Sequence, residues 1–418
     1  MELIIHRGSH QVGGSCVELR CGDSSILIDA GLPLEHPFGS DIEENLPRPL
    51  FDNIKSGKKK LNGVIFSHAH LDHFGLIERL PLNIPIYCGE ASAELINLQR
   101  AFNPRKIHKF RPIFFKARKI FRIGGFVVTP YLMDHSAFDS YGFLLSAGGK
   151  NVFYSGDFRA HGRKAKALDL LKSSPLQVDV LLLEGTTVGP RSHELFPTEQ
   201  ELEEAFLKVI QETAGIVLVS AASMNIDRLV TIFKAATRTN RYFVTDFYTA
   251  EILRRLGRFA KLPQPSWPMV KICYSRVMRA RFRKLGLNEI LERKDQNAIK
   301  WSWFRHNGSR SVFLIRPNFK EEIDEFINLN GASWIYSLWP GYLESSRSLQ
   351  ELQSYLKEKK VRIEVLHTSG HAKISDLIRL VEIIKPNLVV PIHTFYPDDY
   401  SHFLERVKIL KDGEVFTL

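Results

Sequence analysis

The sequence has 418 residues, of which 44% are hydrophobic and 25% are charged. These proportions are those of a folded globular protein, and the length suits two domains better than one. No apolar run reaches the roughly 18–20 residues that a membrane span needs, and residues 1–8 lack the pattern of a signal peptide. The four cysteines form no metal-type pair and are too sparse for a disulfide framework. We therefore expect free thiols, a cytoplasmic location and no membrane partner.

The formal net charge of +11 favours a polyanionic partner. Residues 105–122 contain eight basic and no acidic side chains, and residues 252–288 contain ten basic and no acidic ones. In residues 296–320, five basic side chains alternate with Trp301, Trp303 and Phe304. Proteins that bind single-stranded nucleic acid use such cations to contact the phosphate backbone and such aromatic rings to stack on the bases. The alternative is a set of solvated basic faces with ordinary core tryptophans.

The first 190 residues contain short β-like runs separated by polar turns that carry glycine. Four of these runs end at a side chain with metal-binding or acid–base chemistry, namely Asp29, His68, Asp157 and Glu184. Layered α/β folds build their sites from side chains at the ends of strands. The pattern therefore predicts one site assembled from several strand ends.

From Thr198 onward the pattern changes to alternating helices and strands. Thr198 with Glu201 predicts a capped helix over 198–212, and residues 224–237, 247–259 and 319–329 are also helical in pattern. Buried-type strands alternate with them at 216–219, 242–244, 270–272, 312–315 and 334–336, which indicates a second α/β domain. Because His371 and His393 follow this region, we expect it to be an insertion, with domains at 1–195, 196–360 and 361–418.

Six consecutive residues, His68-Ala69-His70-Leu71-Asp72-His73, contain four side chains of metal-binding type. They follow the strand-like run 63–66, and buried together without a metal they would leave polar atoms unsatisfied. Imidazole and carboxylate ligands without a thiolate suit a hydrolytic zinc centre better than a structural cysteine site. The alternative, a solvated helix start with incidental histidines, fits four ligands in six residues poorly.

This motif, together with others before and after it in the chain, resembles the motifs of the metallo-β-lactamase superfamily in the same order. Residues 25–31, a strand that ends in Asp29-Ala30-Gly31, are similar to the family's early strand. Asp134-His135-Ser136 is similar to its third-motif histidine, and residues 154–159, with Asp157, to its fourth motif. The resemblance implies an α/β fold in the form of an αββα sandwich with a dinuclear metal site.

Later residues resemble the β-CASP group of nucleic-acid-processing enzymes, and its ribonuclease J-like members in particular. Glu184, His371 and His393 are similar to the three additional motifs of that group. Residues 220–228 look like the Ser/Asn-Arg loop of its inserted domain. The resemblance therefore implies that the second α/β domain is a β-CASP-like insertion into the sandwich.

The resemblance also implies a ligand set for two zinc ions, with manganese as an alternative metal. His68, His70 and His135 would hold one ion, Asp72, His73 and His393 the other, and Asp157 would bridge them. Two such ions lower the pKa of a shared water toward about 7 and neutralise charge on an attacked phosphate.

The predicted catalytic residues are Asp72, His371 and Glu184. His371 would donate a proton to the leaving oxygen or hydrogen-bond a phosphate oxygen, and Glu184 would orient a ligand histidine by accepting its free N–H. The alternative for these last two is a polar turn histidine and a strand-end acid.

Two small groups of residues are predicted to bind phosphate. Ser369 and the Gly370 backbone would cradle it, because small residues permit close approach. Ser220, Ser223 and Arg228 lie where a strand turns into a helix N-terminus, which attracts anions. For Ser223, helix capping is an equally good alternative.

The sequence favours a zinc-dependent nuclease that hydrolyses single-stranded RNA. His393 favours RNA because histidine at the third additional motif accompanies the RNA-directed members that the sequence resembles. The alternatives are a DNA nuclease on the same scaffold, a metallohydrolase of small thioesters or lactones, and a catalytically silent binding subunit. Nucleic acid is the expected partner, and a homodimer is left open.

Overall fold

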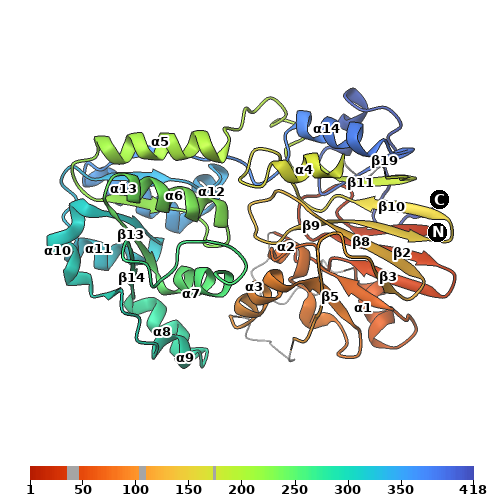
Figure 1. Cartoon of the computed structure of the whole chain (residues 1–418), viewed down its shortest axis with the longest axis horizontal. Helices are drawn as coiled ribbons and strands as arrows, with labels where there is room; N and C mark the ends of the chain where they lie inside the picture. Colours follow the sequence, from red (N-terminus) through yellow and green to blue (C-terminus); the bar gives the residue numbers. More distant parts are fainter. Residues whose placement is uncertain (35–46, 103–109, 173–175) are drawn as a thin grey trace. The chain divides into compact units, whose positions relative to one another are not determined.

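The computed structural model describes residues 1–34, 47–102, 110–172 and 176–418 (Figure 1). Two compact units make up this structure: Met1–Leu195 with Gly370–Leu418, and Phe196–Ser369. Arg105, Lys106 and Lys109 of the predicted basic segment lie outside the described residues. Among the helices of the described residues, none has both the length and the apolar character that a membrane span requires.

The first unit contains two β-sheets. One sheet has the order β20 (Val415–Thr417), β1 (Glu2–Arg7), β2 (Cys16–Cys21), β3 (Ser24–Ile28), β4 (Gly63–Ile65), β5 (Ile86–Gly89) and β6 (Ile113–Phe115). The other has the order β19 (Leu388–Ile392), β11 (Val180–Glu184), β10 (Lys150–Tyr154), β9 (Tyr141–Ala147), β8 (Phe126–Leu132) and β7 (Phe121–Ile123).

Alternation along the strands builds the core of this unit. Leu3 and Ile5 of β1 and Leu182 of β11 lie in one hydrophobic cluster, so the two sheets pack face to face. Leu181 and Leu183 point to the opposite face, where they pack with residues of two helices, Leu168 and Leu377 among them. Each such buried side chain contributes about 1.5–3 kcal/mol relative to exposure.

Helices cover the outside of the sheets (Figure 1). The helices of the first unit are α1 (Arg48–Lys55), α2 (Leu71–Phe74), η1 (Ile77–Arg79), α3 (Glu90–Arg100), α4 (Lys166–Leu171), α14 (Ile374–Ile384) and η5 (Pro397–His402). Helices α4 and α14 cover the outer face of the second sheet, and α3 packs beside β5 of the first. The predicted α/β class, with helices outside two stacked sheets, is confirmed.

Parallel pairing brings the predicted site residues to the same edges. Strands β3, β4 and β5 are parallel in one sheet, and β10, β11 and β19 are parallel in the other. Asp29 follows β3, His68 follows β4, Asp157 follows β10, Glu184 ends β11 and His393 follows β19. The carboxyl ends of parallel strands meet at one edge, as in other open α/β sheets that carry sites there.

The second unit is a seven-stranded sheet in which every pair is parallel. Its order is β15 (Ala298–Ile299), β14 (Val270–Cys273), β13 (Tyr242–Asp246), β16 (Ser311–Leu314), β12 (Val217–Ser220), β17 (Ser333–Tyr336) and β18 (Arg362–Val365). Its helices are α5 (Glu199–Glu212), α6 (Ile226–Arg238), α7 (Phe247–Leu256), α8 (Arg276–Lys284), α9 (Asn288–Leu291), η2 (Trp301–Trp303), α10 (Phe304–Asn307), η3 (Gly308–Arg310), η4 (Pro317–Phe319), α11 (Lys320–Phe326), α12 (Gly341–Ser345) and α13 (Arg347–Glu358).

The second unit reaches Ser369 rather than the predicted boundary at residue 360. The reason is β18, which pairs in parallel with β17 and extends the sheet. Its composition gave little sign of this, because Arg362 and Glu364 make a short and half-polar edge strand. The assignment of this unit as a β-CASP-like insertion stays a prediction.

Helix starts in this unit follow the capping rules with one shift. The predicted capping box is confirmed, since Thr198 and Glu201 exchange both hydrogen bonds at the start of α5. Helix α6 begins at Ile226, and its cap is Asn225, whose side chain accepts from the Arg228 amide. Ser223 is therefore not the cap that the sequence suggested as its alternative role.

The aromatic residues of the third basic segment are largely core. Trp301 and Phe304 are 7% and 2% exposed and belong to the hydrophobic cluster of the second unit, with Trp303 packed against it. The hypothesis that these rings stack on nucleic-acid bases is wrong for Trp301 and Phe304, because their faces contact other aromatic side chains such as Phe313.

A buried ion pair joins α5 to α6. Arg228 and Glu199 have fully buried side chains, and Arg228 Nη2 donates to Glu199 Oε1 at 3.0 Å. Arg228 Nη1 also donates to the Ser337 carbonyl at 3.1 Å, next to the end of β17. Removing one partner of such a pair leaves an uncompensated buried charge.

We predict that Glu199→Ala lowers the stability of the second unit by about 3–5 kcal/mol, because Arg228 loses its counter-charge inside the protein. Thermal unfolding of the full chain, followed by circular dichroism, should show a clearly lower midpoint. Glu204→Ala is the matched control, since Glu204 lies on the same helix and pairs with Arg238 at the exposed surface. Similar midpoints for the two variants would contradict the prediction.

Candidate metal centre

All seven predicted metal ligands lie together in the first unit, where they form two clusters. The first contains His68, His70 and His135, and the second contains Asp72, His73, Asp157 and His393. Within each cluster the ligand-type atoms lie within 4.8 Å of one another. Residues more than 300 positions apart in the sequence therefore meet at the strand edges described above.

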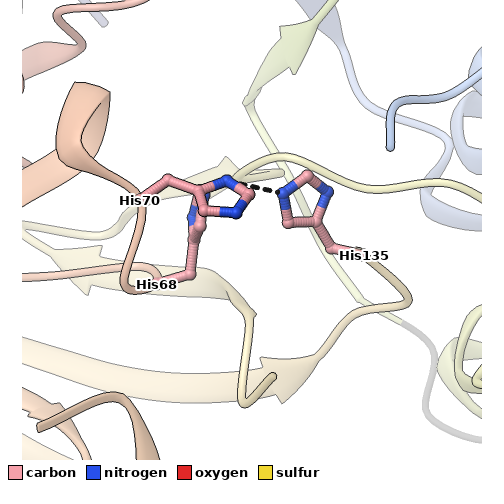
Figure 2. Close-up of side chains that lie close together, drawn as sticks. All are labelled: His68, His70 and His135. Carbon is pink, nitrogen blue, oxygen red and sulfur yellow. Dashed lines mark hydrogen bonds between the residues drawn. The ribbon is translucent and has the colours of Figure 1, made fainter. Parts of the chain in front are cut away.

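In the first cluster, the imidazole rings of His68, His70 and His135 lie close together (Figure 2). His135 Nε2 lies 3.2 Å from His70 Nδ1, and the His68 ring centroid lies 4.8 Å from each of the other two. His68 Nε2 is buried and has no hydrogen-bond partner in the part of the chain that the structure describes. A buried nitrogen in this position needs a ligand, because desolvation without a partner is costly.

In the second cluster, two carboxylates alternate with two imidazoles. Asp157 Oδ2 lies 3.0 Å from His73 Nε2, and Asp72 Oδ2 lies 3.3 Å from His393 Nε2. Asp72 Oδ2 also lies 3.7 Å from His73 Nε2. Four potential ligand atoms thus surround one small volume.

Hydrogen bonds on the far side of the rings select the tautomers. His135 Nδ1 donates to the Gly370 carbonyl at 2.6 Å, and His73 Nδ1 donates to Asp29 Oδ2 at 2.8 Å. With Nδ1 donating, Nε2 is the nitrogen of each ring that faces its cluster, and in neutral His135 it carries the lone pair. This arrangement is typical of metal-binding histidines, whose second nitrogen is held by a carbonyl or a carboxylate.

The protonation states suit a cation. Burial, together with facing imidazoles, holds the pKa of His68 and of His135 well below the usual value, and burial lowers the pKa of His70 to about 4. Burial opposes ionisation of Asp72, but the charges of His73 and His393 lower its pKa to about 2. At neutral pH the first cluster therefore offers neutral imidazoles, and Asp72 of the second cluster is ionised.

The surroundings of His73 in the second cluster favour positive charge. Burial alone would lower its pKa, but the surrounding carboxylates Asp157, Asp72 and Asp29 raise that pKa well above the usual value. Three acidic groups around one imidazole thus attract positive charge. The acidic charge around His73 and the buried His68 Nε2, which has no hydrogen-bond partner among the described residues, are both explained by a bound cation. The donor atoms of the two clusters therefore fit a metal site.

Asp29 supports the clusters from behind. Its side chain accepts from the Ser67 amide at 2.7 Å, the Ser67 hydroxyl at 2.7 Å, His73 Nδ1 at 2.8 Å and the Tyr154 hydroxyl at 2.8 Å. The carboxylate is fully buried, and its backbone has the left-handed φ of 59°. An Asp held in that strained conformation by four donors fixes both a metal-site ring and the start of the six-residue motif.

Glu184, His371 and His393 form a third group beside the clusters. Glu184 accepts from the amides of Phe158 at 3.0 Å and Thr186 at 3.1 Å, and its Oε1 lies 3.4 Å from His371 Nδ1. It therefore holds the loop after Asp157 and contacts His371, rather than the free N–H of a predicted ligand histidine. Burial would lower the pKa of His371, but the nearby carboxylates, Glu184 first, raise it.

Thr186 joins two histidines, a role that the sequence did not suggest. Its hydroxyl lies 2.8 Å from His393 Nδ1 and 3.1 Å from His371 Nδ1. The ring of His371 stacks on that of His393 with centroids 5.6 Å apart. One hydroxyl therefore sets the orientation of both rings.

Comparison with known proteins agrees with this geometry. A family profile described as "Beta-lactamase superfamily domain" matches residues 25–259, more than half of the chain. The chain belongs to the beta-lactamase superfamily. A second profile, described as "Zn-dependent metallo-hydrolase RNA specificity domain", matches residues 357–402 of this superfamily member. The predicted resemblance is confirmed, and the predicted class, a metal-dependent hydrolase, agrees with both descriptions.

Two relatives carry related names. The chain is 23% identical to "Ribonuclease J 2" of Streptococcus pyogenes over 100% of its own length and 76% of that protein. It is 26% identical to "Ribonuclease J" of Helicobacter pylori over 94% of its own length, and it spans about half of that relative, 55%. A solved structure from Enterococcus faecalis, titled as a protein of unknown function, superimposes with a TM-score of 0.79 at 18% identity, covering 100% of this chain and 99% of that one.

The predicted phosphate-binding residues are placed differently. Ser220, Ser223 and Arg228 are buried in the second unit, where Ser220 Oγ accepts from Trp334 Nε1 at 3.0 Å. Ser223 Oγ pairs with the Thr249 hydroxyl at 2.7 Å and with Arg316. Arg228 is committed to Glu199, so its charge is already compensated. These bonds give the three side chains structural tasks, and their binding of phosphate stays a prediction.

Ser369 and Gly370 fall on opposite sides of the boundary between the units. Gly370 belongs to the first unit, and its carbonyl accepts from His135 Nδ1, while phosphate binding by Ser369 and Gly370 stays a prediction. Ser369 is buried, with 4% of its surface exposed. The geometry thus gives Gly370 a positioning role at a predicted ligand.

We predict that Asp29→Ala weakens metal binding about 10–100-fold, because His73 loses the acceptor that holds its tautomer and orientation. Competition with a zinc chelator, followed by elemental analysis, measures this change. Asp29→Asn keeps the volume and one acceptor oxygen and should lose less. Tyr154→Phe, which removes one of the four donors to Asp29, is the matched control. Wild-type zinc affinity in Asp29→Ala would contradict the prediction.

Proposed function

We propose that this protein is a zinc-dependent nuclease that hydrolyses phosphodiester bonds of single-stranded RNA. The observation that carries the proposal is the pair of adjoining clusters, His68, His70 and His135 beside Asp72, His73, Asp157 and His393. Two metal ions side by side are the arrangement that hydrolytic enzymes use on phosphate esters.

The ligand chemistry supports two zinc ions, with manganese as an alternative. Both clusters offer imidazole nitrogens and carboxylate oxygens, and the four cysteines are free thiols elsewhere. Asp157 is the residue we assign to bridge the ions, because its carboxylate lies 3.0 Å from His73 Nε2 and 3.8 Å from His68 Nε2, one in each cluster.

RNA is the substrate that the comparisons and the charge favour together. The profile named for RNA specificity covers residues 357–402, which include His371 and His393. The two relatives described above are named as ribonucleases. The net charge of +11 suits a polyanion. The free cysteines are consistent with our proposal of a reducing cytoplasmic location.

Bound zinc supplies Lewis acidity, which polarises a phosphoryl oxygen and lowers the pKa of water toward about 7. The residues of the chain orient the histidine rings and exclude bulk water. Asp29 and the Gly370 carbonyl hold His73 and His135 with Nε2 facing inward. His68, His73, Asp157 and His393 are almost fully buried, so bulk water is largely excluded from this end of the site.

His371 is the residue we assign to the leaving group. It is the half-buried member of the group, with 21% of its side chain exposed, and its Nδ1 is engaged by Thr186 and Glu184. Its Nε2 is the atom that we assign to donate a proton to the departing oxygen or to hydrogen-bond a phosphate oxygen. Glu184 and Thr186 position this ring.

We predict that the zinc-loaded protein cleaves end-labelled single-stranded RNA in preference to DNA of the same sequence. Asp72→Ala should abolish cleavage, because the second cluster loses one of two carboxylates, and a chelator should do the same reversibly. Products are resolved on a denaturing gel. Preferential cleavage of DNA would contradict the RNA assignment. Cleavage of neither polymer, with zinc confirmed bound, would contradict the nuclease proposal itself and favour a small ester substrate.

We also predict that Thr186→Val lowers kcat on RNA about 10–100-fold. Valine keeps the volume of threonine but removes the hydroxyl that holds His371 and His393. Thr186→Ser, which keeps the hydroxyl, is the control and should retain most activity. Single-turnover rates measured on one RNA decide the matter, and an unchanged rate for the valine variant would show that the two hydrogen bonds do not matter.

A further inference from the structure

Two large aromatic side chains stand exposed directly beyond a predicted metal ligand. Phe395 is 60% exposed and Tyr396 is 42% exposed, and they follow His393 and Thr394 in the chain. Two residues span at most about 7 Å, so Phe395 lies within that distance of His393 along the backbone. Burying such rings would be favourable, and their exposure beside a reactive centre therefore calls for a ligand.

Hydrogen bonds and buried residues hold the segment that carries the two rings. Thr394 is fully buried, and its hydroxyl accepts from the Tyr396 amide at 3.1 Å. Before it, the His393 amide donates to the Gly8 carbonyl at 2.7 Å, and after it, Pro397 is buried at the start of η5. Exposed rings on a well-held backbone lose little conformational entropy when a ligand binds.

Tyr396 lies against the loop 186–189, in which Thr186 contacts His371. A Cβ added to Gly189 would clash with its ring, and Gly189 is three residues beyond Thr186, which contacts His393. The segment 393–396 and the loop 186–189 therefore run side by side in the first unit, and Tyr396 needs the absence of a side chain at Gly189. The Tyr396 ring therefore lies beside the loop that carries Thr186, and Phe395 precedes it in the chain.

We propose that Phe395 and Tyr396 form a stacking subsite for the nucleobases that flank the cleaved phosphate. This inference rests on the function proposed above. A base has an apolar face that stacks on an aromatic ring whatever its identity, which suits an enzyme acting on single strands. The profile named for RNA specificity includes both residues.

The charges around the rings favour a base and not the phosphate chain. Asp398 and Asp399 follow on η5, and their carboxylates repel phosphate. Zinc held by the clusters, of which His393 is a member, would attract phosphate. A strand lying between the two would therefore direct its phosphates to the clusters and its bases to Phe395 and Tyr396.

Fluorescence of 2-aminopurine, which falls when the base stacks, tests the subsite in the full zinc-loaded chain. The protein carries His371→Ala to slow cleavage, and the probe is single-stranded RNA with 2-aminopurine at successive positions. We expect one or two positions to be quenched. Phe395→Ala and Tyr396→Ala should remove the quenching and raise Kd at least about tenfold, while Tyr396→Phe, which keeps the ring, should retain it.

Leu82→Ala is the matched control, since Leu82 is a 70% exposed apolar side chain of the same unit that has no place in the proposed site. Binding and quenching in both aromatic variants like those of Leu82→Ala would overturn the proposal. A change of oligomeric state in the aromatic variants, measured by light scattering, would also overturn it in favour of a protein interface.

A substrate with one abasic position completes the test in otherwise wild-type protein. Removing the stacked base should cost the wild type about as much kcat/KM as the ring substitution, and the two changes together should cost no more than one. Additive losses would overturn the subsite. The two proposals fail separately: quenching that depends on the rings without RNA cleavage would refute the nuclease alone, and cleavage without quenching would refute the subsite alone.

Discussion

The structure of the first unit depends on one electrostatic constraint: carboxylates and imidazoles are buried together at the carboxyl edges of two sheets and need a cation among them. Asp29, Asp72 and Asp157 surround His73 so closely that they raise its pKa, while the buried Nε2 of His68 has no hydrogen-bond partner among the described residues. Buried charges persist when they are paired or bind a metal. The strained backbones of Asp29 and His393, with φ of 59° and 55°, are held because each makes hydrogen bonds that a relaxed conformation would break.

How far the sequence predicts this site depends on the range of each interaction. The six residues 68–73 are local, so their ligand types and spacing sufficed, and the order of His135, Asp157 and His393 supplied the rest. Thr186 escaped prediction because its partners are 185 and 207 positions away, and nothing in its own neighbourhood marks it. A hydroxyl next to Glu184 in a strand-end loop was the only available signal.

In the second unit, sequence patterns predicted the elements and misjudged side-chain surroundings. The capping box at Thr198 and the strand at 270–272 were found from local rules. The ion pair of Arg228 with Glu199 was not foreseen, because a helix start with arginine looks the same in the sequence whether its counter-charge is a ligand or an acidic side chain. Phosphate binding by Arg228 stays a prediction. Trp301 was predicted among stacking rings, because cations nearby on the chain do not reveal that the ring faces inward. Burial is a property of the whole fold, and no short pattern carries it.

The same reasoning explains how a long segment can separate Glu184 from His371 without loosening the site. Within the second unit, Thr368 donates to the Pro197 carbonyl at 2.6 Å, so the chain enters and leaves that unit at one place. Within the first unit, Thr187 and Glu184 contact the carbonyl and the amide of Ala372, and β11 pairs directly with β19. The two chain segments that flank the interruption are thus joined by hydrogen bonds within the first unit, and the two ends of the inserted segment are joined within the second. Insertions are tolerated where chain ends lie close together, and here the contacts that close the gap are made by the residues that also position His371. Within the first unit, Glu184 therefore both joins the two chain segments that flank the interruption and contacts His371.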